Sequence, residues 1–162
     1  MYPWEFLSCP TILFFCPTVL DWQHTSGDPG IVAAGEENMH AAHASFCQWL
    51  DAACATVAQH EREGKAALEQ GDTPGYIAQM RGKADFLSCL AQNAVPLLGS
   101  FPDRAVATRL SHTLARFSRS AGQALDLDSV FYMSALLFPE DHRKGQPNDL
   151  ELFAEQCRKE LA

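Results

Sequence analysis

The first 61 residues of this 162-residue chain contain no lysine and no arginine, but they contain seven aspartates and glutamates. This segment therefore carries a charge of −7, which is nearly all of the net charge of −8 of the chain. Such a surface would repel a phosphate backbone, so the charge distribution argues against a nucleic-acid partner. It favours a basic surface on a partner protein, or the chain's own later helices.

The sequence also lacks an uninterrupted apolar run long enough to cross a membrane. The most apolar stretch, residues 6–20, is broken by Pro10 and Pro17 and is shorter than the roughly 20 residues of a membrane-spanning helix. No basic segment of the kind that begins a signal peptide precedes it, and Glu5 occupies that place. We therefore expect no membrane segment, no export signal and a cytoplasmic location.

Motifs that mark common enzyme classes are missing as well. There is no phosphate-binding glycine loop, nucleophile elbow, kinase motif set or His-Glu-x-x-His motif. The six cysteines form no C-x-x-C pair and have no zinc-finger spacing with histidines. His43 and Cys47 would touch on a helix, but they bring no oxyanion hole and no third group that orients the histidine. The sequence therefore favours a protein that is not an enzyme.

Hydrophobic residues make up 47% and charged residues 20% of the chain, as in an ordinary globular domain. Apolar residues recur with helical spacing in several segments. We predict helices over residues 36–70, 74–98, 101–125, 129–138 and 148–161. The predicted fold is an all-α, single-domain bundle of four to five helices over residues 31–162. Residues 1–30, rich in prolines and aromatics, are predicted to form an irregular arm packed over the bundle.

Glycine, proline and capping residues set the predicted helix ends. Gly71 is expected to end the first helix, and Pro96 to kink the last turn of the second. Ser100, with an aspartate three residues later, predicts the N-cap of the third helix. Asn148, with Glu151 three residues later, predicts the N-cap of the last helix.

A stripe of polar side chains and thiols runs beside the apolar arc of the first predicted helix. It contains Glu36, His40, His43, Cys47, Asp51, Cys54 and Glu61. His40, His43 and Cys47 share one helix face, so they are candidate ligands for zinc, iron or a haem.

Glu37 and His40 have the Glu-x-x-His spacing of ferritin-like di-iron bundles, but the second such pair that these bundles require is missing. Two interpretations of the stripe stay open. One is a metal or haem site at His40, His43 and Cys47. The other is the polar flank of an amphipathic helix, without a cofactor.

The third predicted helix separates an apolar side from a basic side. The basic side contains Arg104, Arg109, His112, Arg116 and Arg119. We interpret it as a solvated face or as one that pairs with the acidic first helix. Arg109 and Arg116 are also candidates for contact with a partner protein.

Residues 138–142 read Phe-Pro-Glu-Asp-His, and Glu151-Leu152-Phe153 follow in the last predicted helix. These residues resemble the proline–aspartate–histidine motif of the TorD-type chaperones, all-helical cytosolic proteins that escort redox enzymes with twin-arginine leaders. The resemblance covers about 16 of the 162 residues. It implies a helical chaperone that binds a basic leader peptide, which would suit the acidic charge.

The hypothesis that follows is a non-enzymatic protein-interaction module: an adaptor, a chaperone, or an inhibitor or immunity-type protein. An acidic helical surface with Glu36, Glu37 and Asp51 is predicted to bind a basic protein or peptide. A metal- or haem-binding bundle is the alternative. The apolar segment 129–138 and the aromatic arm also suggest a homodimer that completes their burial.

Overall fold

The computed structural model describes residues 31–143 and 145–161, with side chains from residue 38 onward. Over these residues the fold is entirely helical. The helices are α1 Ile31–Glu69, α2 Thr73–Ser88, α3 Leu90–Gly99, α4 Arg104–Asp126, α5 Val130–Ala135 and α6 Asp149–Glu160. The predicted all-α class is confirmed, and α2 with α3 occupy the range predicted as one helix. The predicted arm, residues 1–30, lies outside the described residues.

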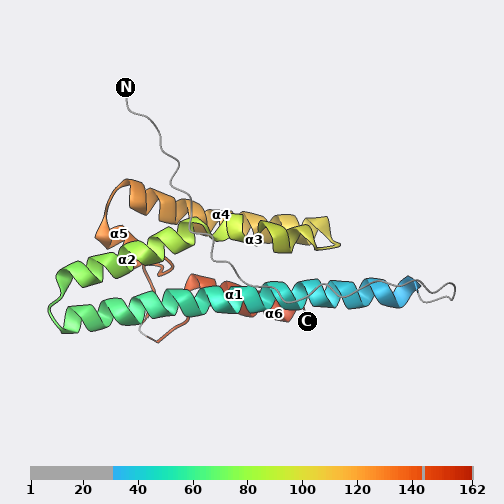
Figure 1. Cartoon of the computed structure of the whole chain (residues 1–162), viewed down its shortest axis with the longest axis horizontal. Helices are drawn as coiled ribbons and strands as arrows, with labels where there is room; N and C mark the ends of the chain where they lie inside the picture. The colour runs from blue at the N-terminus through green and yellow to red at the C-terminus, as the bar shows by residue number, and fades with distance from the viewer. Residues whose placement is uncertain (1–30, 144, 162) are drawn as a thin grey trace, which may run out of the picture.

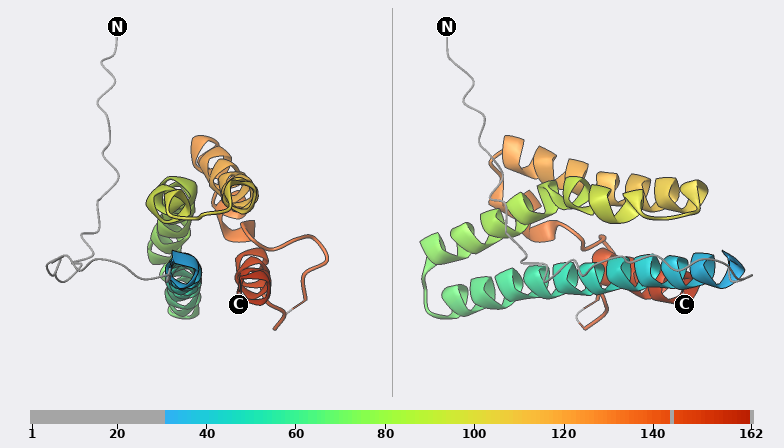
Figure 2. Two further views of the ribbon diagram at one scale, coloured as in Figure 1. Left: turned by 90° about the vertical axis from the view of Figure 1, so that its right-hand side faces the viewer. Right: turned by 45° about the vertical axis from the view of Figure 1, so that its right-hand side comes forward.

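α1 is the longest of the described helices and runs along the longest dimension of the molecule (Figure 1). α2 returns antiparallel beside α1, and α3 and α4 form an antiparallel pair above it (Figure 1). The end-on view in Figure 2 places α6 beside α1 and below α4. The connections from α1 to α2 and from α3 to α4 therefore join antiparallel neighbours, as predicted, whereas α3 continues in the direction of α2 (Figure 1).

The apolar arc of α1 forms one wall of the core. Helical spacing places Ala42, Phe46, Leu50, Ala53 and Val57 on this arc, and all five are buried. Leu68, which the same spacing adds to the arc, is 51% exposed at the end of the helix. They share one cluster with buried leucines of the other helices, including Leu87, Leu90, Leu114 and Leu150. Removal of these side chains from water is the main stabilising contribution to the bundle.

Gly71 ends α1 as predicted. Its φ is +75°, a left-handed conformation that glycine adopts without steric cost. Its amide donates to the Leu68 carbonyl at 3.0 Å, and the Asp72 amide donates to the Ala67 carbonyl at 2.8 Å. This pair of bonds is a Schellman motif. The Asp72 carboxylate then caps α2 by accepting a hydrogen bond from the Gly75 amide at 2.9 Å.

The break between α2 and α3 falls at Cys89, whereas the sequence predicted a kink at Pro96, which lies within α3. A side chain of α4 explains it. The Ser118 hydroxyl donates to the Leu87 carbonyl at 2.9 Å and accepts from the Ala91 amide at 3.0 Å. Leu87 and Ala91 would bond directly in a continuous helix. The inserted hydroxyl interrupts the ladder of helical hydrogen bonds and divides the segment in two.

The start of α4 also differs from the prediction. Its N-cap is Asp103, whose carboxylate accepts from the Ala105 amide at 2.7 Å and the Val106 amide at 3.2 Å. The Ser100 hydroxyl, predicted as the cap, instead donates to the Leu97 carbonyl at 2.6 Å. Ser100 therefore belongs to the end of α3, and a carboxylate takes its place at the start of α4.

α5 is shorter than the predicted range 129–138, because the chain turns soon after Ala135. Leu137 has a φ of +73°, and its carbonyl accepts a hydrogen bond from the Asp149 amide at 3.0 Å. Asn148 then starts α6 with the predicted capping box, in which Glu151 bonds back to the Asn148 amide. Asn148 is only 4% exposed, so this cap is part of the interior.

The bridging hydroxyl of Ser118 leads to a prediction. Ser118→Ala should lower the free energy of unfolding by about 1–2 kcal/mol, because the Leu87 carbonyl and the Ala91 amide both lose their partner. Ser120→Ala is the matched control, since Ser120 is exposed on the same helix. Urea unfolding followed by circular dichroism measures both, and equal effects of the two changes would contradict this role of Ser118.

Candidate functional site

A groove separates α4 from α6. The two helices lie on the same side of the α1–α2 pair (Figure 2), and their backbones make no close contact. The space between them has a volume of about 270 Å³. We call it the α4–α6 groove, and it is lined by Arg109, Leu110, Thr113, Arg116 and Phe117 of α4 and by Asp149, Leu152, Phe153, Gln156, Cys157 and Glu160 of α6.

The floor of the α4–α6 groove is apolar. Leu110, Phe117 and Cys157 are buried, and Phe153 is half-buried. The rings of Phe117 and Phe153 meet edge to face across the groove, with their centroids 6.1 Å apart. Leu152 stands at the rim and is 48% exposed. The apolar surface that solvent reaches in the groove therefore comes mainly from Leu152 and Phe153.

Charged side chains form the walls of the groove. The Arg109 guanidinium donates to the Glu160 carboxylate at 2.6 Å and so links α4 to α6 at one end. The Arg116 guanidinium lies over the ring of Phe117, 5.8 Å from its centroid. Asp149 lies in the first turn of α6, where a negative charge is favourable. Arg109 and Arg116, both predicted as contact residues, therefore belong to one site.

The basic side of α4 continues the α4–α6 groove outward. A shallow hollow of about 730 Å³ is lined by Arg104, Ala105, Thr108, Arg109, His112, Thr113 and Arg116. Three of these residues, Arg109, Thr113 and Arg116, also line the groove. Among the side chains that the structure describes, none on this side of α4 pairs with the acidic first helix: α4 and α1 make no close backbone contact, and Arg109 binds Glu160 of α6.

The three candidate metal ligands of α1 have separate surroundings. His40 is exposed, whereas His43 packs on the Phe101 ring, with centroids 4.9 Å apart, and its Nδ1 lies 3.3 Å from the Leu161 carbonyl oxygen. Among the described residues, no three His, Cys, Asp or Glu side chains form a group that would hold a metal ion. The hypothesis of a metal site at His40, His43 and Cys47 stays a prediction from spacing alone.

The thiols on α1 and α6 are poor nucleophiles. Burial, with a smaller contribution from Asp51, raises the pKa of Cys47. Burial and the nearby Glu151 raise the pKa of Cys54 to about 11, and burial raises the pKa of Cys157 to about 12. A thiol needs a lowered pKa to be a thiolate at neutral pH. Burial therefore disfavours the thiolate form of all three side chains.

Of the three acidic residues predicted to bind a partner, the structure describes one side chain. Asp51 is 53% exposed and lies 3.4 Å from the Arg158 guanidinium of α6. Glu36 and Glu37 lie in α1, but their side chains are outside the described residues. Asp51 is thus engaged within the bundle, and the predicted acidic contact surface stays a prediction.

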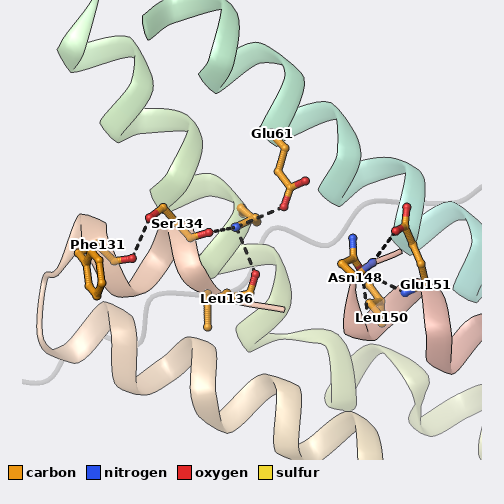
Figure 3. Close-up of polar contacts among 8 residues, drawn as sticks. Glu61, Phe131, Ser134, Leu136, Asn148, Leu150 and Glu151 are labelled. Atoms are coloured by element: carbon orange, nitrogen blue, oxygen red, sulfur yellow. Dashed lines mark hydrogen bonds and ion pairs between the residues drawn. The ribbon is translucent and has the colours of Figure 1, made fainter. Parts of the chain in front are cut away.

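A buried lysine is the polar centre of the bundle. The Lys83 ammonium is fully buried, and it donates to the Ser134 carbonyl at 3.0 Å, to the Glu61 carboxylate at 3.4 Å and to the Leu136 carbonyl at 3.5 Å. It also lies over the Phe138 ring, 5.4 Å from the centroid. Figure 3 shows these oxygen acceptors converging from α1 and from the end of α5. We call these five residues the Lys83 cluster.

Burial and charge act in opposite directions on the pKa values of the central pair. Burial lowers the pKa of Lys83, and the carboxylate of Glu61 opposes that change. Burial raises the pKa of Glu61, and Lys83 opposes that change. Burial therefore opposes the charged form of both groups, and each group favours the charged form of the other.

The burial of Lys83 was not predicted, although helical spacing in the sequence indicates it. Lys83 follows Met80 by three residues and precedes Leu87 by four, so helical spacing places it on their buried face. The α6 side of the α4–α6 groove was missed for another reason. Only the meeting of α4 and α6 makes Leu152 and Phe153 part of a site with the arginines.

The residues that resemble the TorD-type motif fall into two places. The ring of His142 packs on that of Phe138, a member of the Lys83 cluster, with centroids 4.8 Å apart. Glu151 completes the cap of α6, and Phe153 lines the α4–α6 groove. In this structure the motif therefore holds the segment between α5 and α6 against the bundle.

α5 exposes more apolar surface than a buried helix would. Phe131 is 73% and Tyr132 is 54% exposed, whereas Met133 is buried. The predicted homodimer, in which a second copy covers this surface, stays a prediction. None of the described helices combines the length and the apolar character needed to span a membrane.

Comparisons with known proteins give no relative. No protein-family model matches the sequence, and searches of curated proteins and of solved structures find no match.

The Lys83 cluster predicts coupled stability effects. Lys83→Met should lower the free energy of unfolding by about 3 kcal/mol, because it leaves the partly buried Glu61 carboxylate without a counter-charge. Adding Glu61→Gln should restore about 1 kcal/mol or more, because the unpaired charge is then removed. Urea unfolding of the wild type, both single variants and the double variant measures this coupling.

Lys65→Met is the control for loss of a lysine charge. Its ion pair with Glu69 is exposed, so the free energy of unfolding should change by about 0.5 kcal/mol or less. If the effects of Lys83→Met and Glu61→Gln simply add, the two side chains do not depend on each other in the core.

Metal content separates the two interpretations of the stripe on α1. We expect purified, untagged protein to contain no stoichiometric zinc, iron or copper, because the described residues form no ligand group. Elemental mass spectrometry of the wild type and of His40→Ala/His43→Ala is the measurement. A near-stoichiometric metal that disappears in the double variant would establish the metal site instead.

Proposed function

We propose that the protein is a non-enzymatic protein-interaction module that binds a segment of a partner protein in the α4–α6 groove. The observation that carries this proposal is the groove itself: two helices held apart over an apolar floor, with charged side chains along both walls. A partner side chain seated on Phe153 and Leu152 would complete their burial, as a core residue would.

The composition of the groove supports protein binding. Protein interfaces combine an apolar centre with a polar rim and are enriched in aromatic residues and arginine. Here Phe117 and Phe153 form the centre, Leu152 is an exposed apolar rim residue, and Arg109 and Arg116 stand on one wall. Arginines and aromatics in such positions commonly provide most of the binding free energy.

The chemistry of the described thiols supports a non-enzymatic role. Cys157 is the thiol that lines the groove, and burial raises its pKa to about 12. It is therefore protonated at neutral pH and is not activated as a nucleophile. In this proposal it packs beneath the floor of the groove.

The broader expectations from the sequence form part of this proposal. The protein would act in the cytoplasm as an adaptor, a chaperone or an inhibitor of its partner. Contact of a basic partner with the acidic surface at Glu36, Glu37 and Asp51 remains a separate expectation. So does a TorD-like chaperone role, which requires a basic leader peptide as the ligand.

The proposal predicts that a rim substitution weakens binding. Peptides selected from a random displayed library against the wild-type protein should bind Leu152→Asp about tenfold more weakly, because a carboxylate would replace an apolar contact at the rim. Leu68→Asp is the matched control, since Leu68 has nearly the same exposure, 51%, and lies at the end of α1. Fluorescence polarisation with the selected peptides measures both affinities. Equal binding to Leu152→Asp and wild type would refute the groove as the site.

A further inference from the structure

We propose that the α4–α6 groove takes an acidic amphipathic segment, whose apolar side lies on the groove floor and whose carboxylates bind the arginines of α4. This inference rests on the proposed function and adds the chemistry of the ligand. It is opposite in charge to the basic partner expected from the net charge of the chain.

The first support is the distribution of unpaired positive charge. Among the described side chains, five arginines have no ion pair: Arg62, Arg104, Arg116, Arg119 and Arg143. Three of these five lie on α4, although the chain as a whole is acidic. Arg104 reaches only the Gly99 carbonyl, at 3.5 Å, and Arg116 lies over a ring. These guanidinium groups therefore retain the capacity to bind carboxylates.

The second support is a carboxylate that this surface already binds. Glu160 of α6 accepts a hydrogen bond from Arg109 at 2.6 Å, at the edge of the groove. The pair shows that a carboxylate from an element lying along α4 reaches the arginine wall. Arg116 follows Arg109 by two helical turns, about 10 Å along the axis, and faces the same groove. A segment that continues along α4 would meet Arg116 with a second carboxylate.

The third support is the continuity of charged and apolar surface. Arg109, Thr113 and Arg116 line both the basic hollow and the α4–α6 groove, so one ligand contacts both. A helix with carboxylates beside an apolar stripe has this division of surface. A nucleic acid would match the arginines but not the apolar floor. The net charge of −8 also opposes a long polyanion, whereas a short acidic segment needs only the local field of α4.

The test compares peptide selections against two variants of equal net charge and a third, milder one. Arg104→Glu/Arg116→Glu removes the two unpaired arginines that line the hollow. Arg62→Glu/Arg143→Glu makes the same change in charge at two exposed sites away from α4. Arg104→Gln/Arg116→Gln serves as a milder variant. Circular dichroism and thermal unfolding establish that each variant is folded, and one random displayed peptide library is selected against each protein and the wild type.

We expect peptides selected by the wild type and by Arg62→Glu/Arg143→Glu to be enriched in Asp and Glu relative to the library. Arg104→Glu/Arg116→Glu should lose this enrichment, and Arg104→Gln/Arg116→Gln should reduce it. The best wild-type peptide should bind Arg104→Glu/Arg116→Glu about tenfold more weakly or worse. Its affinity should also fall between roughly 50 and 300 mM salt, because the contacts are ionic.

Three results would overturn the inference: a wild-type pool without acidic enrichment, a pool enriched in Lys and Arg, or acidic enrichment that persists unchanged in Arg104→Glu/Arg116→Glu. The affinity of the selected peptides for Leu152→Asp shows whether only the acidic ligand is excluded or the proposed function as well. If the peptides bind Leu152→Asp more weakly but are not acidic, the groove is still the binding site and its ligand is not an acidic segment. Peptides that are indifferent to Leu152→Asp exclude the groove as well.

Discussion

The position of the segment after α5 depends on one buried ammonium group. Lys83 projects from α2 into the interior, where it binds the Glu61 carboxylate of α1 and the carbonyls of Ser134 and Leu136. Because a buried charge is costly unless its donors have partners, the ammonium stays buried at low cost only while these acceptors remain in place. The chain after α5 is thereby held against α1 and α2, and the start of α6 is positioned by the same segment.

The α4–α6 groove follows from where these constraints place the helices. Ser118 inserts its hydroxyl between Leu87 and Ala91, which breaks the α2–α3 segment and binds α4 to that break. α6 instead packs along α1. Because α4 and α6 pack against different helices, their backbones make no close contact with each other. Leu110, Phe117 and Phe153 fill the space between them only in part, and a groove remains.

Local features of the chain were predictable from the sequence. The buried arc from Ala42 to Val57, the left-handed Gly71 and the capping box of Asn148 depend on residues close together along the chain. The break at Cys89 and the cap at Asp103 were not predicted. The break at Cys89 depends on Ser118 of another helix. At the start of α4, both Ser100 and Asp103 were suitable N-cap residues, and the Asp103 carboxylate is the one that caps the helix.

The sequence by itself determined the helical class, most helix ends, the apolar face of α1 and the basic side of α4, because periodicity and capping are local. Tertiary structure alone decided which faces meet. Helix packing joined Arg109 and Arg116 to Leu152 and Phe153 of α6, and enclosed Lys83 with Glu61. These contacts join residues far apart in the chain, and no local pattern specifies which helix will be the neighbour.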